Sequence, residues 1–210
     1  MAYHAAKSGG TGKGYICASV PLELYEKMAA VSDKYPTFVV PVPRVKNDIV
    51  DGETDRAYEF YFLQWDFHEV PPTPSAIEDP FSPPPPPPED TPANPPTSTI
   101  LFTPLQEYKM RQSFATPYLV LTFYTDLAGS HGTVLMRGEI TPASAGAAAG
   151  TEERHMLTQE DAQYLAMELQ KFYLWNMDKE GEGERLLKVF HEKPEDFKWE
   201  ELLKHAELSA

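Results

Sequence analysis

The chain has 210 residues, a length typical of one domain with or without appendages. It contains 18 Lys and Arg against 32 Asp and Glu, and the resulting net charge of −14 disfavours nucleic acid and anionic membranes as partners. No apolar run is long enough to predict a membrane span, and a single cysteine, Cys17, excludes an internal disulfide framework and a cysteine-rich zinc site.

The first part of the chain predicts a tail, one helix and two strands. The glycine-rich start, residues 1–14, is expected to be a flexible N-terminal tail ahead of one domain over residues 15–210. Pro21 begins a helical pattern with its apolar residues on one face. Residues 37–44 predict a short strand, and its prolines indicate a sheet edge or a strand end, because proline cannot donate a ladder hydrogen bond. Residues 57–67 predict an aromatic-rich strand covered on both sides.

Proline then dominates one stretch of the sequence. Residues 71–97 contain 13 of the chain's 21 prolines, including six in a row at 83–88. Proline has no amide hydrogen and favours the polyproline II conformation, so this stretch can neither join a sheet nor pack a core. We expect a disordered, solvated insertion that interrupts the domain. A ligand for a proline-binding module such as an SH3 domain is the alternative.

The remaining sequence alternates strands and helices. The predicted order is a strand (98–104), a short helix (105–114), two strands joined by a turn (118–127 and 133–140), a long helix capped by Thr158 (159–175) and two closing helical segments (185–193 and 194–208). This order predicts an α+β fold built on a mainly antiparallel sheet of five to seven strands with flanking helices. The expected core includes Leu121, Phe123, Val134, Met136, Leu165, Leu169 and Phe172.

Motifs for catalysis, cofactors and metals are missing. The stretch SGGTGKGY at 8–15 fails as a phosphate loop, because position 7 is Lys7 where a glycine is needed and position 14 is Gly14 where Ser or Thr is needed. The six histidines show no metal-binding spacing. Small apolar neighbours make a buried, inert thiol the expected state of Cys17. We therefore expect no cofactor, no metal and no enzyme.

The stretch HGTVLMRGEI, residues 131–140, combines a strand with an arginine–glutamate pair. Residues two apart on a strand share a face, so Leu135, Arg137 and Glu139 lie opposite the core residues. A neighbouring arginine lowers the pKa of a carboxylate, which suits a salt bridge more than a proton shuttle. Three roles stay open for this pair: a structural salt bridge, a partner-binding surface or catalysis.

Six segments, in order, resemble the mitochondrial ATP synthase assembly factor 1 family. They cover residues 15–69 and 98–208 and read ICASVPLELYEKM…KYPTFVVPVPR, YEFYFLQWDF, TILFTPLQEYKMRQSFATP, GTVLMRGEI, LTQEDAQYLAMELQKFY and LLKVFHEKPEDFKWEELLKHAE. Members usually also carry a presequence and an N-terminal helical region, which this sequence does not show. The proline-rich segment stands where other members have a short connection, so the resemblance implies that it is dispensable.

The resemblance implies an assembly chaperone rather than an enzyme. Such a protein binds the free beta subunit of the ATP synthase catalytic head and prevents its aggregation until the alpha subunit takes its place. A monomer in the mitochondrial matrix is expected, without membrane insertion. The resemblance and the strand pattern together give four candidate partner-binding residues: Leu135, Arg137, Glu139 and, from the segment that matches the family's Leu-x-x-Tyr helix, Tyr108.

Two other functions compete with this interpretation. A signalling adaptor would work through the six consecutive prolines, and deletion of residues 71–97 would abolish its function. An enzyme would need a concave pocket with perturbed pKa values around Glu139 and His131. The structure can test the second directly.

Overall fold

The computed structural model describes residues 2–4, 14–45, 56–69, 96–143, 154–175 and 181–207. The expected insertion at 71–97 lies outside the described residues except for its last two, so its disorder stays a prediction. The start of the chain differs from the expected flexible tail at residues 2–4. These form a strand that pairs with residues 17–19, where an open sheet edge offers backbone hydrogen bonds.

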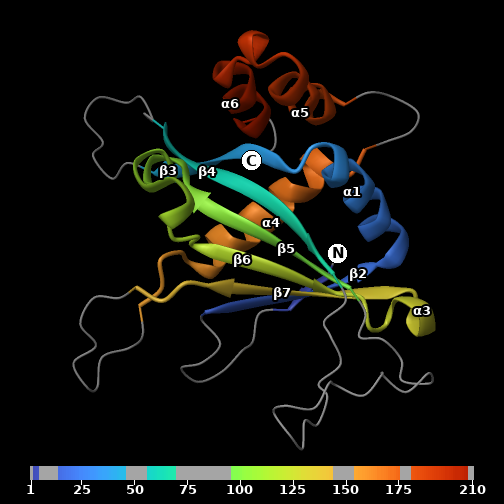
Figure 1. Cartoon of the computed structure of the whole chain (residues 1–210). Helices are drawn as coiled ribbons and strands as arrows, with labels where there is room; N and C mark the ends of the chain where they lie inside the picture. Colours follow the sequence, from blue (N-terminus) through green and yellow to red (C-terminus); the bar gives the residue numbers. More distant parts are fainter. Residues whose placement is uncertain are drawn as a thin grey trace, which may run out of the picture.

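One antiparallel sheet forms the centre of the structure (Figure 1). Its seven strands lie in the order β1-β2-β7-β6-β5-β4-β3, and every neighbouring pair is antiparallel. The strands are β1 (Ala2–His4), β2 (Tyr15–Pro21), β3 (Thr37–Val45), β4 (Arg56–His68), β5 (Thr97–Pro104), β6 (Leu119–Tyr124) and β7 (Thr133–Ile140). The expected α+β class and the expected strand number are confirmed.

Helices α1 and α4 pack on one face of this sheet (Figure 1). Helix α5 packs against α4, and α6 reaches β3 at the edge of the sheet. Helix α2 contacts β4 and β5 from the opposite face. The helices are α1 (Leu22–Lys34), α2 (Leu105–Arg111), α3 (Ala128–His131), α4 (Gln159–Tyr173), α5 (Glu182–Glu192) and α6 (Trp199–Glu207), with short 3₁₀ turns η1 (Gln112–Phe114) and η2 (Pro194–Asp196).

The hydrophobic core lies between the sheet and the layer of α1 and α4. Strand residues alternate between buried and exposed, as their sequence pattern predicts. Aromatic side chains connect the two layers: Phe38 of β3 packs on Phe172 of α4 with ring centres 4.7 Å apart. Burial of each large apolar side chain contributes about 2 kcal/mol. The expected core is confirmed, since all seven of its residues are buried: Leu121, Phe123, Val134, Met136, Leu165, Leu169 and Phe172.

Chain order explains how the strands come together in one sheet. Helix α1 carries the chain from β2 to the far edge, where β3 begins, and the strands then return one by one until β7 pairs with β2. The outer strand β3 contains Pro41 and Pro43, which have no amide hydrogen to offer a second chain. The edge position expected for residues 37–44 is confirmed.

Three local predictions were wrong. Cys17 is exposed rather than buried, because strand alternation turns its side chain away from the core that its neighbours Ile16 and Ala18 enter. The connection between β6 and β7 is not a plain turn, because Ala128–His131 form a helical turn that ends at Gly132 with φ of 60°. Strand β4 is not covered on both sides either. Its odd-numbered residues up to Trp65 face the core, whereas its even-numbered aromatic residues are half-buried, and among the described elements α2 alone lies over them. Aromatic content alone could not distinguish a two-sided burial from one short covering helix.

Candidate partner interface

The second face of the sheet is largely open. In the region that the structure describes, the long helices lie on the other side, and α2 covers only the end of β4 and β5. The strand register aligns the open-face side chains in rows that cross the sheet. The three rows are Glu139–Val120–Leu101–Gln64, Arg137–Thr122–Thr99–Asp66 and Leu135–Tyr124–Thr97–His68. The first and third rows therefore include apolar side chains, and the second row, which lies between them, is polar throughout.

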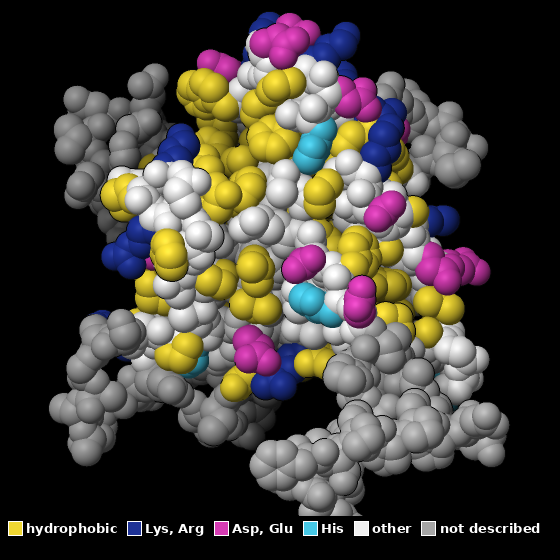
Figure 2. All heavy atoms as spheres, in the orientation of Figure 1, with side chains coloured by type: hydrophobic (Ala, Val, Ile, Leu, Met, Phe, Trp, Pro, Cys, Tyr) yellow, Lys and Arg dark blue, Asp and Glu magenta, His cyan; other side chains and the backbone are white. Residues whose placement is uncertain are grey.

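Figure 2 shows the same face as filled atoms. Hydrophobic side chains lie scattered across the sheet among uncharged polar ones. Charged side chains gather mainly over the α5–α6 region at the top of the view and along the rim. A surface with apolar anchors and a polar surround is typical of interfaces that form and then release.

Arg137 and Glu139 form an ion pair at one side of the open face. Arg137 Nη2 lies 3.2 Å from Glu139 Oε1, and about half of each side chain is exposed. The guanidinium also stands over the ring of Tyr15 on the neighbouring strand, 4.9 Å from its centre. The negative charge of Glu139 raises the pKa of Arg137, so the arginine stays charged. The expected placement on the non-core face is confirmed.

Gly138, between these two residues, has the opposite orientation. A Cβ atom at this position would lie 2.4 Å from Ile16 Cγ1 and 2.8 Å from Leu121 Cδ2, both in the core. Only a residue without a side chain lets the neighbouring strands pack here. The Arg-Gly-Glu sequence thus presents two charges outward and leaves room for core side chains inward.

The structure separates the fourth candidate, Tyr108, from the other three. Leu135 is 41% exposed on β7, close to Arg137 along the strand. Tyr108 lies on α2 and packs on Phe62 of β4, with ring centres 4.4 Å apart. Strands β5 and β6 lie between β4 and β7, so Tyr108 belongs to another part of the open face. Its packing attaches α2 to the sheet.

Sequence reasoning missed the most exposed apolar side chains of the described structure. Met110 on α2 is 72% exposed and Phe114 on η1 is 87% exposed. No residue of either element is buried. The signal was present, since a methionine and a phenylalanine stand within a polar stretch. Helical periodicity over residues 105–114 could not show which side chains the sheet leaves uncovered.

An open groove of about 830 Å³ lies between α2 and the end of the sheet. It is lined by Tyr58, Glu59, Phe60, Met156, Tyr118 and residues 104–107 and 109–111. Burial raises the pKa of the Tyr118 hydroxyl, and the carboxylates of Glu107 and Glu59 raise it further. The phenol therefore stays protonated and can donate a hydrogen bond.

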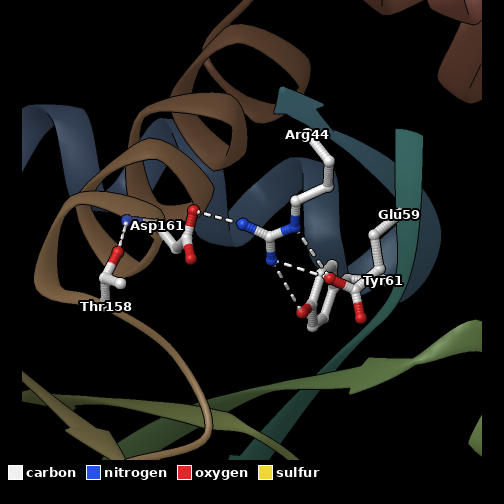
Figure 3. A network of polar contacts seen from close by, with 5 residues as sticks. All are labelled: Arg44, Glu59, Tyr61, Thr158 and Asp161. Atoms are coloured by element: carbon white, nitrogen blue, oxygen red, sulfur yellow. Dashed lines mark hydrogen bonds and ion pairs between the residues drawn. The ribbon is translucent and has the colours of Figure 1, made fainter. Parts of the chain in front are cut away.

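A network around Arg44 fixes this end of the sheet (Figure 3). Its guanidinium donates to Glu59 of β4 at 2.7 and 3.0 Å and to Asp161 of α4 at 2.6 Å. Burial alone would lower the pKa of Arg44, but the bonds to Asp161 and Glu59 raise it. Thr158 accepts from the Asp161 amide at 3.1 Å, which confirms the expected helix cap. The start of α4 is thereby attached to the β3–β4 edge.

The family model described as ATP11 protein matches residues 1–203. The chain belongs to this family. Membership confirms the resemblance to the mitochondrial ATP synthase assembly factor 1 family. A curated relative is "Protein atp11, mitochondrial" from Schizosaccharomyces pombe, 29% identical over 162 residues. The match covers 77% of this chain and 41% of that relative, so the chain spans about two fifths of the relative's length.

The open face of this ATP11 family member does not assemble the acid–base pair considered from the sequence. His131 precedes β7 and Glu139 lies near its other end, about 20 Å away at the usual rise of a strand. Neither residue lines the groove beside α2. Within the described ranges, no three His, Cys, Asp or Glu side chains gather to hold a metal ion. None of the described helices has the length and apolar character required to cross a bilayer.

Proposed function

We propose that this protein is an assembly chaperone of the mitochondrial F-type ATP synthase. It binds the free beta subunit of the catalytic head, prevents its aggregation and releases it to the alpha subunit. It acts as a monomer in the mitochondrial matrix and catalyses no reaction. Membership of the ATP11 family and a relative named as mitochondrial support this proposal. The structural observation that carries it is the open sheet face with exposed apolar side chains.

This surface meets the physical requirements of an assembly chaperone. A subunit that waits for its partner exposes an apolar interface, which makes it prone to aggregate. A chaperone must cover that interface but must not bind so tightly that the proper partner cannot replace it. A face with scattered apolar anchors such as Leu135 and Tyr15, interrupted by the polar row that contains Thr99 and Thr122, provides moderate rather than extreme affinity.

The Arg137–Glu139 pair gives this surface two charges that orient a bound partner. The pair is half-exposed and stabilised by Tyr15, so both charges can contact a partner without a loss of packing. Arginine beside an aromatic ring is a frequent anchor in protein interfaces. Leu135, Arg137 and Glu139 together form the contact that we assign to the beta subunit, with Tyr108 as the residue that supports α2.

Aggregation of the isolated beta subunit with and without this protein tests the proposal. The wild-type chain is expected to suppress light scattering at a near-stoichiometric ratio. Arg137→Ala and Leu135→Ser should each weaken suppression about threefold or more while Tm changes by less than about 2 °C. Lys204→Ala, which removes an exposed cation on α6, is the control and should have no effect on suppression. Unprotected beta subunit in the presence of wild-type protein would refute the proposal.

Deletion of residues 71–95, which ends before β5 begins, separates the chaperone from a proline-dependent adaptor. A chaperone that uses the sheet face should keep its suppression of aggregation after this deletion. An adaptor that works through the consecutive prolines at 83–88 should lose its function. The same light-scattering assay, run beside the full chain, gives the comparison.

A further inference from the structure

The α2–η1 segment, Leu105–Phe114, carries the two most exposed large apolar side chains among the described residues. Met110 and Phe114 are 72% and 87% exposed, whereas the next large apolar side chain, Trp199, is 55% exposed. Figure 1 draws α2 as the green coil that follows β5. Single exposed apolar residues are ordinary on protein surfaces, but a phenylalanine almost fully in water beside an exposed methionine marks an interaction site.

Backbone strain occurs in the same segment. Gln112 has φ of 54° and ψ of −127°, and it is the only non-glycine residue with positive φ in the described part of the chain. This region of backbone space strongly favours glycine, because a Cβ atom clashes there. Strain of this kind persists where the surrounding structure enforces it, and such positions concentrate at functional sites.

The segment is also held firmly at two points. Tyr108 in the middle of α2 packs on Phe62, and beyond the end of the segment Tyr118 donates its amide to the carbonyl of Phe102 at 2.8 Å. Between them, the Ala115 amide donates to the Gln112 carbonyl at 3.0 Å. Met110 and Phe114 therefore stand on a preorganised support, which lowers the entropy cost of binding through them.

The local charge is opposite to that of the whole molecule. Lys109 and Arg111 flank Met110 and are both exposed, in a chain with net charge −14. Arg111 lies 3.8 Å from Glu107, a contact that leaves 64% of the arginine side chain in solvent. A partner that fits this segment would offer an apolar recess with carboxylates at its edge. The negative net charge disfavours an anionic lipid surface in that place.

We propose that the α2–η1 segment is a client anchor. It inserts Met110 and Phe114 into an apolar recess of the unassembled beta subunit, and Lys109 and Arg111 pair with carboxylates at the edge of that recess. This inference rests on the proposed function and adds to it a second contact, distinct from the Arg137–Glu139 region of the sheet. The kink at Gln112 fixes the positions of the two anchors relative to each other.

Two double variants of the full chain test the apolar contact, with purified beta subunit as the probe. Met110→Gln with Phe114→Ser should weaken binding about tenfold or more. Met167→Gln with Phe67→Ser is the matched control, because both of these side chains are 43% exposed elsewhere. The control pair should change affinity less than about twofold. Equal affinity of the anchor variant and the wild type would overturn the anchor and leave the proposed function standing.

Charge reversal and cross-linking identify the partner surface. Lys109→Glu with Arg111→Glu should weaken binding about tenfold and reduce its dependence on salt, whereas Lys204→Glu should not. A photo-reactive benzoylphenylalanine at position 114 should cross-link to a beta-subunit peptide that contains Asp or Glu beside apolar residues. Cross-links to a second copy of this chain, or to a basic peptide, would overturn the inference. Failure of wild-type protein to bind beta subunit would instead refute the proposed function, and the anchor with it.

Discussion

Three consecutive residues of β7 show how one short stretch serves both the fold and the surface. Arg137 and Glu139 carry their charges on the open face, where they pair at 3.2 Å. Gly138 faces the core, where Ile16 and Leu121 occupy the volume that a side chain would need. Strand alternation thus explains how an apolar strand can carry an arginine and a glutamate: both side chains lie on the face opposite the core. The pair is a surface feature, and the glycine is the structural one.

Gly138→Ala is expected to destabilise the protein by about 1–3 kcal/mol. The new methyl group would come within 2.4 Å of Ile16 and 2.8 Å of Leu121, so the two strands that flank β7 would have to move. Thermal or denaturant unfolding measures the loss. Gly129→Ala is the control, because nothing lies within 4 Å of a Cβ atom at that position and the residue is helical. An unchanged midpoint for Gly138→Ala would show that the core there is loosely packed.

Gln112→Gly is expected to stabilise the chain, by up to about 1 kcal/mol, because glycine adopts the φ of 54° without strain. Gln106→Gly provides the comparison, since the same replacement at an exposed helical position of α2 should cost about 1 kcal/mol. Both variants add the same freedom to the unfolded chain, so their difference isolates the backbone strain. Equal destabilisation by the two replacements would argue against strain at Gln112.

At the scale of elements, one polar network decides how α4 meets the sheet. Arg44 on β3 bonds both to Glu59 on the next strand and to Asp161 in the first turn of α4. Two carboxylates share one cation, so loss of the arginine leaves two negative charges close together. The hydrophobic core holds the middle of α4, and the network attaches its first turn.

Arg44→Met should lower the free energy of unfolding by about 1–2 kcal/mol. This is less than the 3–5 kcal/mol typical of a broken buried pair, because a third of the Arg44 side chain is exposed. Hydrogen exchange at residues 159–163 should accelerate more than at the C-terminal half of α4. Arg44→Lys keeps the charge but cannot bond to both carboxylates in the same geometry, so an intermediate loss is expected. Uniform exchange along α4 in Arg44→Met would contradict this role.

Periodicity in the sequence was sufficient for the elements that bury one face. The strands of the β6–β7 hairpin and the capped helix α4 follow from alternation, helical spacing and Thr158. The β1 strand was missed because three residues pair by backbone hydrogen bonds and carry no pattern. The strain at Gln112 and the exposure of Phe114 depend on what the rest of the sheet leaves uncovered. No local pattern encodes that, so the candidate site was found only in part.

At the scale of the whole molecule, an open face with exposed apolar residues coexists with a strong net charge. The exposed apolar side chains that we propose as the client-binding surface could also allow two copies to associate. A charge of −14 on every copy opposes that contact at neutral pH. Under the proposed function, solubility and client binding are therefore separate properties: the total charge sets the first, and a few side chains on one face set the second.

This balance predicts self-association near the isoelectric point. At pH 7 the chain should be monomeric, and near pH 4.8, its sequence isoelectric point, it should form larger species in light scattering. The fold should persist there. A hydrogen bond from Arg185 holds the pKa of Glu182 below its ordinary 4.5, so the stability that this pair contributes is present above that ordinary value and is lost as the pH falls through the lower, folded-state pKa.

Substitution on the open face distinguishes specific contact from general precipitation. Leu135→Ser and Phe114→Ser should each reduce the association near pH 4.8, because they remove exposed apolar surface without a change in net charge. Trp199→Ser, which removes an exposed aromatic ring on α6 away from this face, should leave it unchanged. Circular dichroism at pH 4.8 must first show native helix and strand content. Equal association of all three variants would mean that charge neutralisation alone drives it, and that the open sheet face has no special tendency to bind protein.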